Sequence, residues 1–354
     1  MKAAQIVEPK KPLQIADLST SPAKNTEVVV NVAATGVCHS DLHLWEGGYD
    51  MGDGTFLKVT DRGVRYPVVP GHEIAGTVAE TGPDVRDLNP GDPVLVYPWL
   101  GCGSCRTCLA GNEHLCDKPR SIGLFQNGGY AESVKVPHYK YLADISGLDQ
   151  SSATSLACAG LTGFTAVKQA SSNSPEYIVI IGAGGLGLMG VQISKAVTDS
   201  KIICVDLDDA KLQTAREMGA DYTINSRSMP GEDDAASKII SVCGGRGADS
   251  VIDFVNAPAT VEMGLKILPK RGNMVLVGLF GGSVSLPLVT IPLKSLTIQG
   301  AYTGRYSDML ELVSLAKRGS ICPKITKRYS LDEANTAMND LINRRIRGRA
   351  VINP

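Results

Sequence analysis

The sequence predicts a mixed α/β protein with two domains, a β-rich N-terminal domain and a doubly wound parallel sheet. The chain has 354 residues, which is too long for one ordinary hydrophobic core. Before Ser151, short β-branched runs are separated by turn residues, whereas after it such runs alternate with helical stretches. Because strand–helix alternation implies parallel strands with right-handed crossovers, we expect the second domain to be of this kind.

In the N-terminal part, three short runs rich in valine and other strand-forming residues are bounded by Gly, Pro or Asp, which predicts strands. These runs cover residues 27–34, 73–81 and 93–97. Residues 47–66 are polar and contain glycines without clear periodicity. We therefore expect a loop or a small excursion there.

The second part begins with residues 151–170, a run of small residues that opens with serine caps and predicts one helix. The pattern beyond it predicts alternating strands and helices and then a mainly helical tail. The expected strands cover residues 177–181, 202–206, 222–225, 250–254, 273–278, 296–300 and 350–352, and the expected helices cover residues 185–197, 209–218, 307–317 and 332–343.

Composition excludes several classes of partner. The 35 basic and 36 acidic residues nearly cancel, so neither nucleic acid nor an anionic membrane is a default partner. The N-terminus lacks the apolar run of a signal peptide, and no apolar stretch is long enough to cross a bilayer, so we expect a cytoplasmic protein. In that reducing compartment, nine cysteines favour metal binding or catalysis over disulfides.

The strongest local motif is a run of four cysteines. Their spacing is Cys102-x2-Cys105-x2-Cys108-x7-Cys116. Four thiolates in one short loop match a tetrahedral zinc site with every position taken, which would stabilise a lobe that lacks its own core. An iron–sulfur cluster also suits the first three spacings, but the distant fourth cysteine and the absence of a following proline favour zinc.

A glycine-rich loop follows the expected strand 177–181. Its residues are Gly182, Ala183, Gly184, Gly185, Leu186 and Gly187. A glycine motif that ends a strand and opens a helix is the context that identifies a dinucleotide site. Gly182 would permit the tight turn, Gly184 the close approach of a pyrophosphate, and Gly187 the packing of helix against strand, with the helix N-terminus facing the phosphates.

Asp206 ends the next expected strand, nineteen residues after Gly187. A carboxylate at this place accepts hydrogen bonds from the adenosine ribose and repels a 2′-phosphate, which favours NAD over NADP. The alternative is an ordinary turn residue at the end of a strand.

Three further segments contain single metal-ligand candidates: Cys38, His72 and Cys158. Each is weak by itself, because a lone cysteine is more often a small packing residue. Taken in order with the four cysteines and the glycine loop, however, these segments resemble the zinc-dependent medium-chain alcohol dehydrogenases over essentially the whole chain. Residues 98–99, 113–117 and 136–141 are similar to the archaeal NAD-dependent members.

The resemblance implies a GroES-like catalytic domain over residues 1–156, with a structural-zinc lobe at about 98–118. It implies a Rossmann NAD-binding domain over residues 157–296 and a C-terminal segment, 297–354, that partly returns to the catalytic domain. The implied cofactors are NAD and two zinc ions per subunit. A homo-oligomer is also implied, with a tetramer favoured over a dimer and subunits pairing near residues 296–300.

By the same resemblance, Cys38, His72 and Cys158 hold the catalytic zinc in the Cys2His set by which alcohol dehydrogenases as a class hold it. The open position lets the metal act as a Lewis acid on the alcohol. Ser40 would begin a proton relay, and His43 would end it at the surface. Asp41 would orient His72, while Glu73 is either a transient extra ligand or a group behind the ligands.

The remaining implied residues contact cofactor or substrate. Lys211 would lie near the ribose and Arg349 at the pyrophosphate, while His39 is either a pyrophosphate contact or a solvated loop residue. The backbone of Val277, Gly278 and Leu279 would line the nicotinamide pocket. The expected substrate pocket consists of Trp99, Leu124, Thr162 and Leu279.

The implied reaction is the reversible oxidation of primary or secondary alcohols to aldehydes or ketones with hydride transfer to NAD. A polyol or sugar-alcohol dehydrogenase of the same superfamily is the alternative. Many of those enzymes replace the third ligand by glutamate, so Cys158 favours the alcohol type. A non-catalytic nucleotide-binding relative would be expected to lose ligands, and all three are present.

Overall fold

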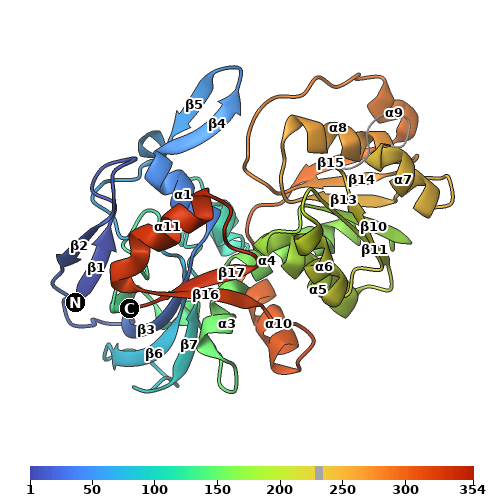
Figure 1. The fold of residues 1–354 in the computed structure, drawn as a ribbon. Helices are drawn as coiled ribbons and strands as arrows, with labels where there is room; N and C mark the ends of the chain where they lie inside the picture. The colour runs from blue at the N-terminus through green and yellow to red at the C-terminus, as the bar shows by residue number, and fades with distance from the viewer. Residues whose placement is uncertain (228–233) are drawn as a thin grey trace. The chain divides into compact units, whose positions relative to one another are not determined.

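The computed structural model describes residues 1–227 and 234–354. Their contacts divide the chain into two compact units (Figure 1). Unit 1 consists of Met1–Gly48, Lys58–Leu161 and Thr303–Pro354, and unit 2 of Tyr49–Leu57 and Thr162–Tyr302. The sequence placed its domain boundaries after residues 156 and 296. Of the expected C-terminal segment, 297–354, residues from Thr303 on belong to the same unit as the N-terminus, whereas residues 297–302 belong to unit 2.

Unit 1 is built on a seven-stranded sheet in the order β16-β17-β3-β6-β7-β9, with β8 pairing with β3. β17 lies parallel to β16, and it pairs antiparallel with β3. Residues from the end of the chain therefore complete the sheet that its beginning starts. The strands are β3 (Val28–Gly36), β6 (Glu73–Thr81), β7 (Pro93–Val96), β8 (Ser133–Val136), β9 (Leu142–Asp144), β16 (Ile325–Ser330) and β17 (Arg349–Asn353).

Smaller elements surround this sheet. A separate two-stranded sheet joins β1 (Lys2–Gln5) to β2 (Gln14–Asp17), and the sequence analysis missed it. The helices of unit 1 include α1 (His39–Glu46), α2 (Arg106–Leu109), α10 (Tyr306–Lys317) and α11 (Ala334–Ile342). The last two match the helices expected in the tail. Among the described residues, none of the helices has the length and apolar character needed to cross a membrane.

The segment expected to be a loop, residues 47–66, contains a hairpin. β4 (Gly48–Gly52) pairs with β5 (Thr55–Lys58), and a short 3-10 helix follows at Val59–Arg62. Asp53 and Gly54 connect the strands with φ of 51° and 76°, the conformation that a two-residue Asp-Gly hairpin turn requires. The expectation was wrong because these strands are largely exposed and so lack the buried, alternating pattern of a core strand.

The single helix expected over residues 151–170 is broken. α3 (Gln150–Ala153) and a 3-10 turn (Thr154–Ala157) are separated from α4 (Ala159–Ala170) by Cys158, whose φ and ψ are −134° and −73°. Trp99 Nε1 donates to the Ala157 carbonyl at 2.9 Å, so a tertiary contact takes up an acceptor at the break. The interruption places Cys158 at a junction between helices.

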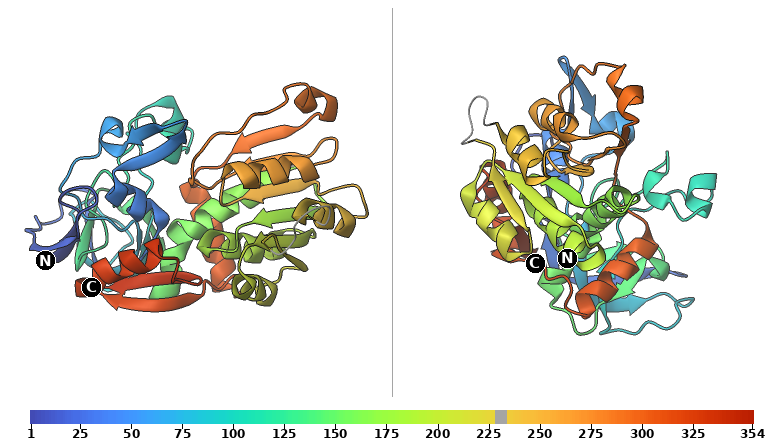
Figure 2. Two further views of the ribbon diagram at one scale, coloured as in Figure 1. Left: turned by 45° about the horizontal axis from the view of Figure 1, so that its top comes forward. Right: turned by 90° about the vertical axis from the view of Figure 1, so that its right-hand side faces the viewer.

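Unit 2 is built on a six-stranded sheet in the order β12-β11-β10-β13-β14-β15, with every neighbouring pair parallel. This is the strand order of a dinucleotide-binding fold, and the predicted fold class is confirmed. Helices cover both faces of the sheet (Figure 2). The strands are β10 (Tyr177–Ile181), β11 (Lys201–Asp206), β12 (Tyr222–Asn225), β13 (Ser250–Asp253), β14 (Asn273–Leu276) and β15 (Thr297–Gly300).

The core of unit 2 follows from the composition of its strands. Val179, Ile203 and Val251 lie on three adjacent strands and are fully buried. Ile239 of α7 (Ala235–Val242) packs into the same cluster. Strands buried on both faces read as continuous β-branched runs, which is why the sequence predicted them. In folds of this kind, loops at the carboxyl ends of the strands form the ligand site.

Candidate metal centres and nucleotide site

The four cysteines of the lobe form one cluster in unit 1. The Sγ atoms of Cys102, Cys105, Cys108 and Cys116 all lie within 4.8 Å of one another. The Cys105–Cys108, Cys105–Cys116 and Cys102–Cys108 sulfurs are 3.5, 3.8 and 3.9 Å apart. A tetrahedron with zinc–sulfur bonds of about 2.3 Å has edges of about 3.8 Å, so this donor set fits zinc.

The lobe supports its sulfurs mainly with local backbone groups. Cys105 caps α2, and its sulfur accepts the Cys108 N–H at 3.5 Å. Cys116 Sγ accepts the N–H groups of Cys102 and Lys118 at 3.3 and 3.4 Å. Backbone N–H groups stabilise the thiolate form, and those near Cys102 lower the pKa of this thiol to about 6.

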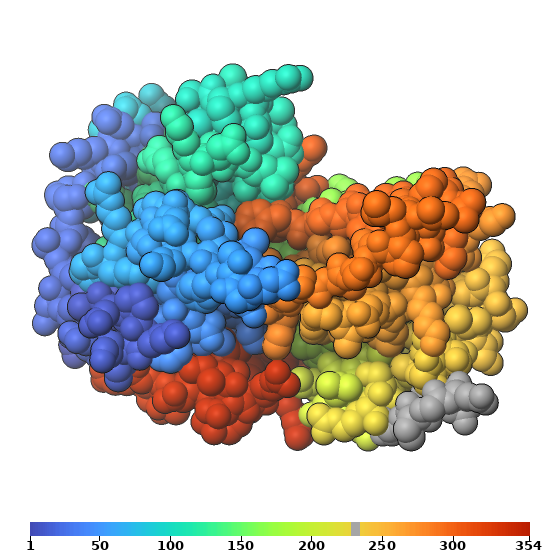
Figure 3. All heavy atoms as spheres, turned by 90° about the horizontal axis from the view of Figure 1, so that it is seen from above, coloured from blue at the N-terminus to red at the C-terminus, as the bar shows by residue number. Residues whose placement is uncertain are grey.

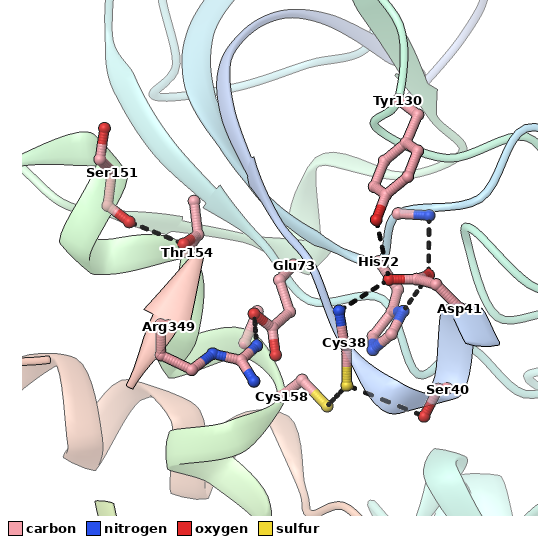
Figure 4. Close-up of polar contacts among 12 residues, drawn as sticks. Cys38, Ser40, Asp41, His72, Glu73, Tyr130, Ser151, Thr154, Cys158 and Arg349 are labelled. Carbon is pink, nitrogen blue, oxygen red and sulfur yellow. Dashed lines mark hydrogen bonds and ion pairs between the residues drawn. The ribbon is translucent and has the colours of Figure 1, made fainter. Parts of the chain in front are cut away.

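A second cluster in unit 1 consists of Cys38, His72, Glu73 and Cys158, whose ligand atoms also lie within 4.8 Å of one another (Figure 4). All four side chains are buried. The two sulfurs are 3.9 Å apart, again close to a tetrahedral zinc edge. His72 Nε2 is buried and has no hydrogen-bond partner among the described residues. Two thiols and an imidazole nitrogen without a hydrogen-bond partner among the described residues form a donor set that fits zinc.

Asp41 connects the chain segments that carry two of these ligands. This fully buried carboxylate accepts the Cys38 N–H at 3.0 Å and the Gly71 N–H at 3.0 Å, and it lies 3.3 Å from His72 Nδ1. It thereby leaves Nε2 as the nitrogen available to a metal. Tyr130 OH donates to the same carboxylate at 3.4 Å. Tyr130 was missed by sequence reasoning, because nothing in its local pattern distinguishes it.

Gly71 must be a glycine at this place. Its φ is +91°, and a Cβ would overlap the Tyr130 ring and approach Thr35 Oγ1 to 2.9 Å. The left-handed conformation turns the chain so that the next residue, His72, enters the cluster. In the local sequence Gly-His-Glu, the glycine is therefore required sterically, and the histidine is the candidate metal ligand.

The charges of the cluster favour metal binding. A hydrogen bond from the Cys158 thiol outweighs burial and lowers the pKa of Cys38 well below its ordinary value. Burial would lower the pKa of His72, but the Asp41 carboxylate and the Cys38 sulfur raise it above its ordinary value. Without a metal, hydrogen bonds among the buried thiols, the imidazole and Asp41 therefore stabilise the cluster. A divalent cation would replace the shared protons.

Glu73 and Arg349 form a buried ion pair beside the cluster. Arg349 Nη2 donates to Glu73 Oε2 (Figure 4). A Cβ at Gly36 would overlap Glu73 Oε2, so the neighbouring strand must leave this space. Burial raises the pKa of Glu73, and Arg349 partly offsets that rise. Arg349 was expected at a pyrophosphate; the structure pairs it with Glu73, whose role as ligand or supporting group stays open.

The two expected relay residues lie one turn apart on α1. Ser40 Oγ is 4.0 Å from Cys38 Sγ. His43 is partly exposed, with Nδ1 3.5 Å from Glu46 Oε2. Burial lowers the pKa of His43, and Glu46 opposes that shift. His39, the neighbouring candidate, is exposed. The relay stays a prediction.

The glycine loop of unit 2 has the expected shape. Gly182 has φ +95°, and a Cβ at Gly187 would overlap the Gly182 carbonyl. Apart from its chain neighbours, no described residue has an atom within 4 Å of a Cβ built at Gly184, which caps α5 (Gly185–Val197). The first and third glycines are thus required by packing, and the space above the second is open to a ligand.

Asp206 binds the glycine loop in this structure. Its Oδ2 accepts the Ala183 N–H at 2.7 Å, and its Oδ1 accepts the N–H groups of Leu207 and Asp208 at 2.7 and 3.1 Å. The turn role that the sequence left as an alternative is therefore present. The ribose role stays a prediction, as does that of Lys211, which is partly buried in α6 (Asp209–Glu217).

The four expected pocket residues divide between the units. Trp99 and Leu124 are buried in unit 1, where the Trp99 ring lies 5.2 Å from the His72 ring. Thr162 is buried in unit 2, and Leu279 is 43% exposed there. Trp99 is thus placed beside the metal cluster by geometry, while the pocket as a whole stays a prediction.

Comparisons with known proteins agree with both units. A family model described as "Alcohol dehydrogenase GroES-like domain" matches residues 24–146. A model described as "Zinc-binding dehydrogenase" matches residues 185–318. The first range contains the lobe and two of the buried ligands, and the second contains most of the parallel sheet.

Full-length relatives extend the match. The chain is 42% identical to an NAD-dependent alcohol dehydrogenase of Sulfurisphaera tokodaii, over 100% of both chains. It is 32% identical to a D-arabinose 1-dehydrogenase (NADP(+)) of Saccharolobus solfataricus, over 100% of this chain and 97% of that protein. The crystal structure of the alcohol dehydrogenase from Aeropyrum pernix superposes with a TM-score of 0.90 at 31% identity, covering both chains fully. The chain belongs to the zinc-binding medium-chain alcohol dehydrogenase family.

Proposed function

We propose that this chain is an NAD-dependent alcohol dehydrogenase, which reversibly oxidises primary or secondary alcohols to aldehydes or ketones. The observation that carries the proposal is the buried Cys38–His72–Cys158 cluster with an unpaired imidazole nitrogen. The same chain carries a glycine loop at the end of β10. Relatives named as NAD-dependent alcohol dehydrogenases, at 42% and 40% identity, support both the cofactor and the substrate class.

The chain's residues would divide the work as follows. Cys38, His72 and Cys158 would hold zinc, which supplies Lewis acidity toward the alcohol oxygen when bound. Asp41 keeps the imidazole oriented. When bound, NAD would accept the hydride that the alcohol loses. Ser40 would take the alcohol's proton while its own proton moves, by way of the cofactor ribose, to His43 near the surface. A histidine suits this end because an imidazole exchanges protons near neutral pH, and His43 is partly exposed.

A metal and substrate assay tests the proposal. Purified protein is expected to contain two zinc ions per chain, and a chelator should remove one of them together with activity. NAD reduction should be seen with ethanol, a longer alkanol or benzyl alcohol. Silence across the panel in protein that retains both zinc ions would contradict the proposed function.

A sugar substrate is the second candidate. Its support is the relative named D-arabinose 1-dehydrogenase (NADP(+)), at 32% identity. The panel should therefore include D-arabinose and a linear polyol, each with NAD and with NADP. A higher kcat/KM for D-arabinose with NADP than for any alcohol with NAD would replace the first proposal by this one.

We further propose that the chain is a homo-oligomer, with a tetramer favoured over a dimer. β15 is the edge strand of its sheet, and edge strands offer unpaired backbone groups to another chain. Next to it, around α9 (Thr290–Lys294), Leu288, Val289 and Leu293 are 76%, 68% and 70% exposed. This segment lies in the surface coloured orange in Figure 3. Apolar patches of this kind mark protein interfaces.

Light scattering tests the assembly. The wild type is expected to be a tetramer. The double variant Leu288→Asp/Leu293→Asp should form smaller species, because an unpaired charge is unfavourable in a buried interface. A wild-type monomer would contradict the proposal.

The thiol-rich metal groups also support a cytoplasmic location, which cell fractionation would test.

A further inference from the structure

A short segment of unit 1, residues 127–130, is hydrogen-bonded to the chain that leads to His72. Its sequence is Asn-Gly-Gly-Tyr, and none of its residues belongs to a metal-ligand cluster. We propose that this segment positions His72 for the metal: its backbone holds the peptide groups before His72, and the Tyr130 hydroxyl holds Asp41, the partner of the imidazole. The inference rests on the proposed function, because it requires zinc at the buried cluster.

The backbone of the 127–130 segment is bonded to residues 69–71 by three hydrogen bonds. The N–H groups of Gly128, Gly129 and Tyr130 donate to the carbonyls of Val69, Gly71 and Pro70 at 2.8, 2.7 and 3.0 Å. Asn127 adds a side-chain bond, because its Oδ1 accepts the Val69 N–H at 3.0 Å. The three residues that precede His72 are therefore all held by one segment.

Two glycines allow the segments to lie this close. A Cβ at Gly128 would overlap the Gly71 carbonyl. A Cβ at Gly129 would lie 2.6 Å from Ile74 Cγ1 and 2.9 Å from Thr35 Oγ1. Neither glycine has a left-handed backbone conformation, so close packing and not turn geometry excludes a side chain at both places. The Gly-Gly pair is thus explained by the approach of one backbone to another.

The Tyr130 side chain completes the hydrogen bonding of Asp41 (Figure 4). Each carboxylate oxygen of Asp41 has two partners. Oδ1 accepts the Gly71 N–H and lies beside His72 Nδ1, while Oδ2 accepts the Cys38 N–H and the Tyr130 hydroxyl. A carboxylate bonded at both oxygens cannot rotate without losing a partner. Tyr130 therefore helps to fix the direction in which Asp41 meets the imidazole.

The surroundings of Tyr130 favour a persistent bond, although its length of 3.4 Å is at the long end. Tyr130 and Asp41 are both fully buried, so neither can exchange its partner for bulk water. Burial raises the pKa of Tyr130, so its hydroxyl keeps its proton and donates. The Tyr130 carbonyl also accepts the Ala4 N–H at 2.8 Å, which anchors the segment to β1.

Tyr130→Phe isolates the hydroxyl, because it keeps the ring and removes the donor. The zinc affinity of the buried cluster is measured by competition with a chromogenic chelator, with the lobe zinc retained. We expect the Kd for zinc to rise about fivefold, as for the loss of one hydrogen bond. Co²⁺ in place of this zinc gives visible absorption bands that report ligand geometry, and these bands should shift in Tyr130→Phe.

Tyr97→Phe is the matched control. Tyr97 is also buried in unit 1, and its hydroxyl donates to the Gly304 carbonyl at 2.7 Å, a bond that involves no member of the cluster. This change should lower the melting temperature, because a buried hydrogen bond is lost. It should leave the Kd for zinc and the cobalt bands at their wild-type values.

An Asn127 pair tests the role of the backbone. Asn127→Ala removes the side-chain acceptor of the Val69 N–H and should raise the Kd for zinc by about two- to threefold, since the three backbone bonds remain. Asn127→Asp keeps an acceptor there and should restore the wild-type Kd. An unchanged Kd in Asn127→Ala would overturn the backbone role. Melting temperatures show which variants fold, and this pair provides the test if Tyr130→Phe does not.

Failure of the proposed function and failure of this inference give different results. If wild-type protein binds zinc only in the four-cysteine lobe, the proposed function fails, and the inference fails with it. If the wild type binds two zinc ions but Tyr130→Phe leaves the Kd and the cobalt bands unchanged, or Tyr97→Phe changes them equally, only the positioning role is overturned. A selective effect of Tyr130→Phe supports it.

Discussion

The two metal-ligand clusters of unit 1 are built in different ways. The lobe takes its four sulfurs from residues 102–116, supports them with nearby backbone N–H groups, and leaves Cys102 and Cys105 partly exposed. The Cys38–His72–Cys158 cluster takes its ligands from three distant segments and buries all of them. Asp41 joins two of those segments. A closed local site suits stability, whereas a buried, assembled site suits chemistry that needs an exactingly placed group.

The largest expected effect is the loss of turnover when a buried ligand is changed. Cys38→Ser should remove one zinc ion and lower kcat/KM by about a thousandfold or more, because the Lewis acid is lost. Steady-state kinetics and metal analysis measure the effect. Cys322→Ser changes an exposed cysteine outside both clusters and serves as the control. Turnover that survives in Cys38→Ser would remove the basis of the comparison.

Next comes the loss of stability when the lobe is changed. Cys105→Ser should lower the free energy of unfolding by about 3 kcal/mol or more, since structural zinc binding contributes directly to folding. The folded fraction should still turn over substrate below its melting temperature. Denaturant unfolding with activity measured on the same samples tests the difference. Equal loss of folding in Cys38→Ser and Cys105→Ser would show that the two clusters do not differ in role.

A smaller effect is expected for the residue that assembles the buried cluster. Asp41→Ala should weaken zinc affinity at that cluster by about 10- to 100-fold, because His72 loses its orienting partner. Competition with a chromogenic chelator measures this. Glu113→Gln provides a matched control: Glu113 accepts hydrogen bonds from Tyr141 OH and Lys140 Nζ at 2.6 and 3.1 Å near the lobe, so it should leave this affinity unchanged.

The smallest expected effect lies in unit 2, where the glycine loop is a local motif like the lobe. Asp206→Gly should raise the kcat/KM ratio of NADP to NAD by about tenfold, because a carboxylate that repels a 2′-phosphate is removed. Asp206 also binds the Ala183 N–H, so the loop will lose a contact and turnover with NAD should fall as well. An unchanged ratio would mean that Asp206 serves only the turn.

Local motifs explain most of what could be predicted. The cysteine spacing and the glycine loop each lie within one short segment, and the strands of unit 2 are continuous β-branched runs. The hairpin at β4–β5 was missed despite its Asp-Gly turn, because its strands are exposed. The break at Cys158 was missed because Trp99, from a distant part of the chain, binds the Ala157 carbonyl there.

Motif spacing and strand composition were enough to predict the parallel sheet, the glycine loop and the candidate ligands. The side chains that support such features are known only from the folded chain: Tyr130 on Asp41, Arg349 on Glu73, and Asn256 on Gly278. Each of these pairs joins residues from separate segments of the chain. Spacing within one segment fixes local geometry, but partners far apart in sequence meet only when packing of the whole unit brings their backbones together.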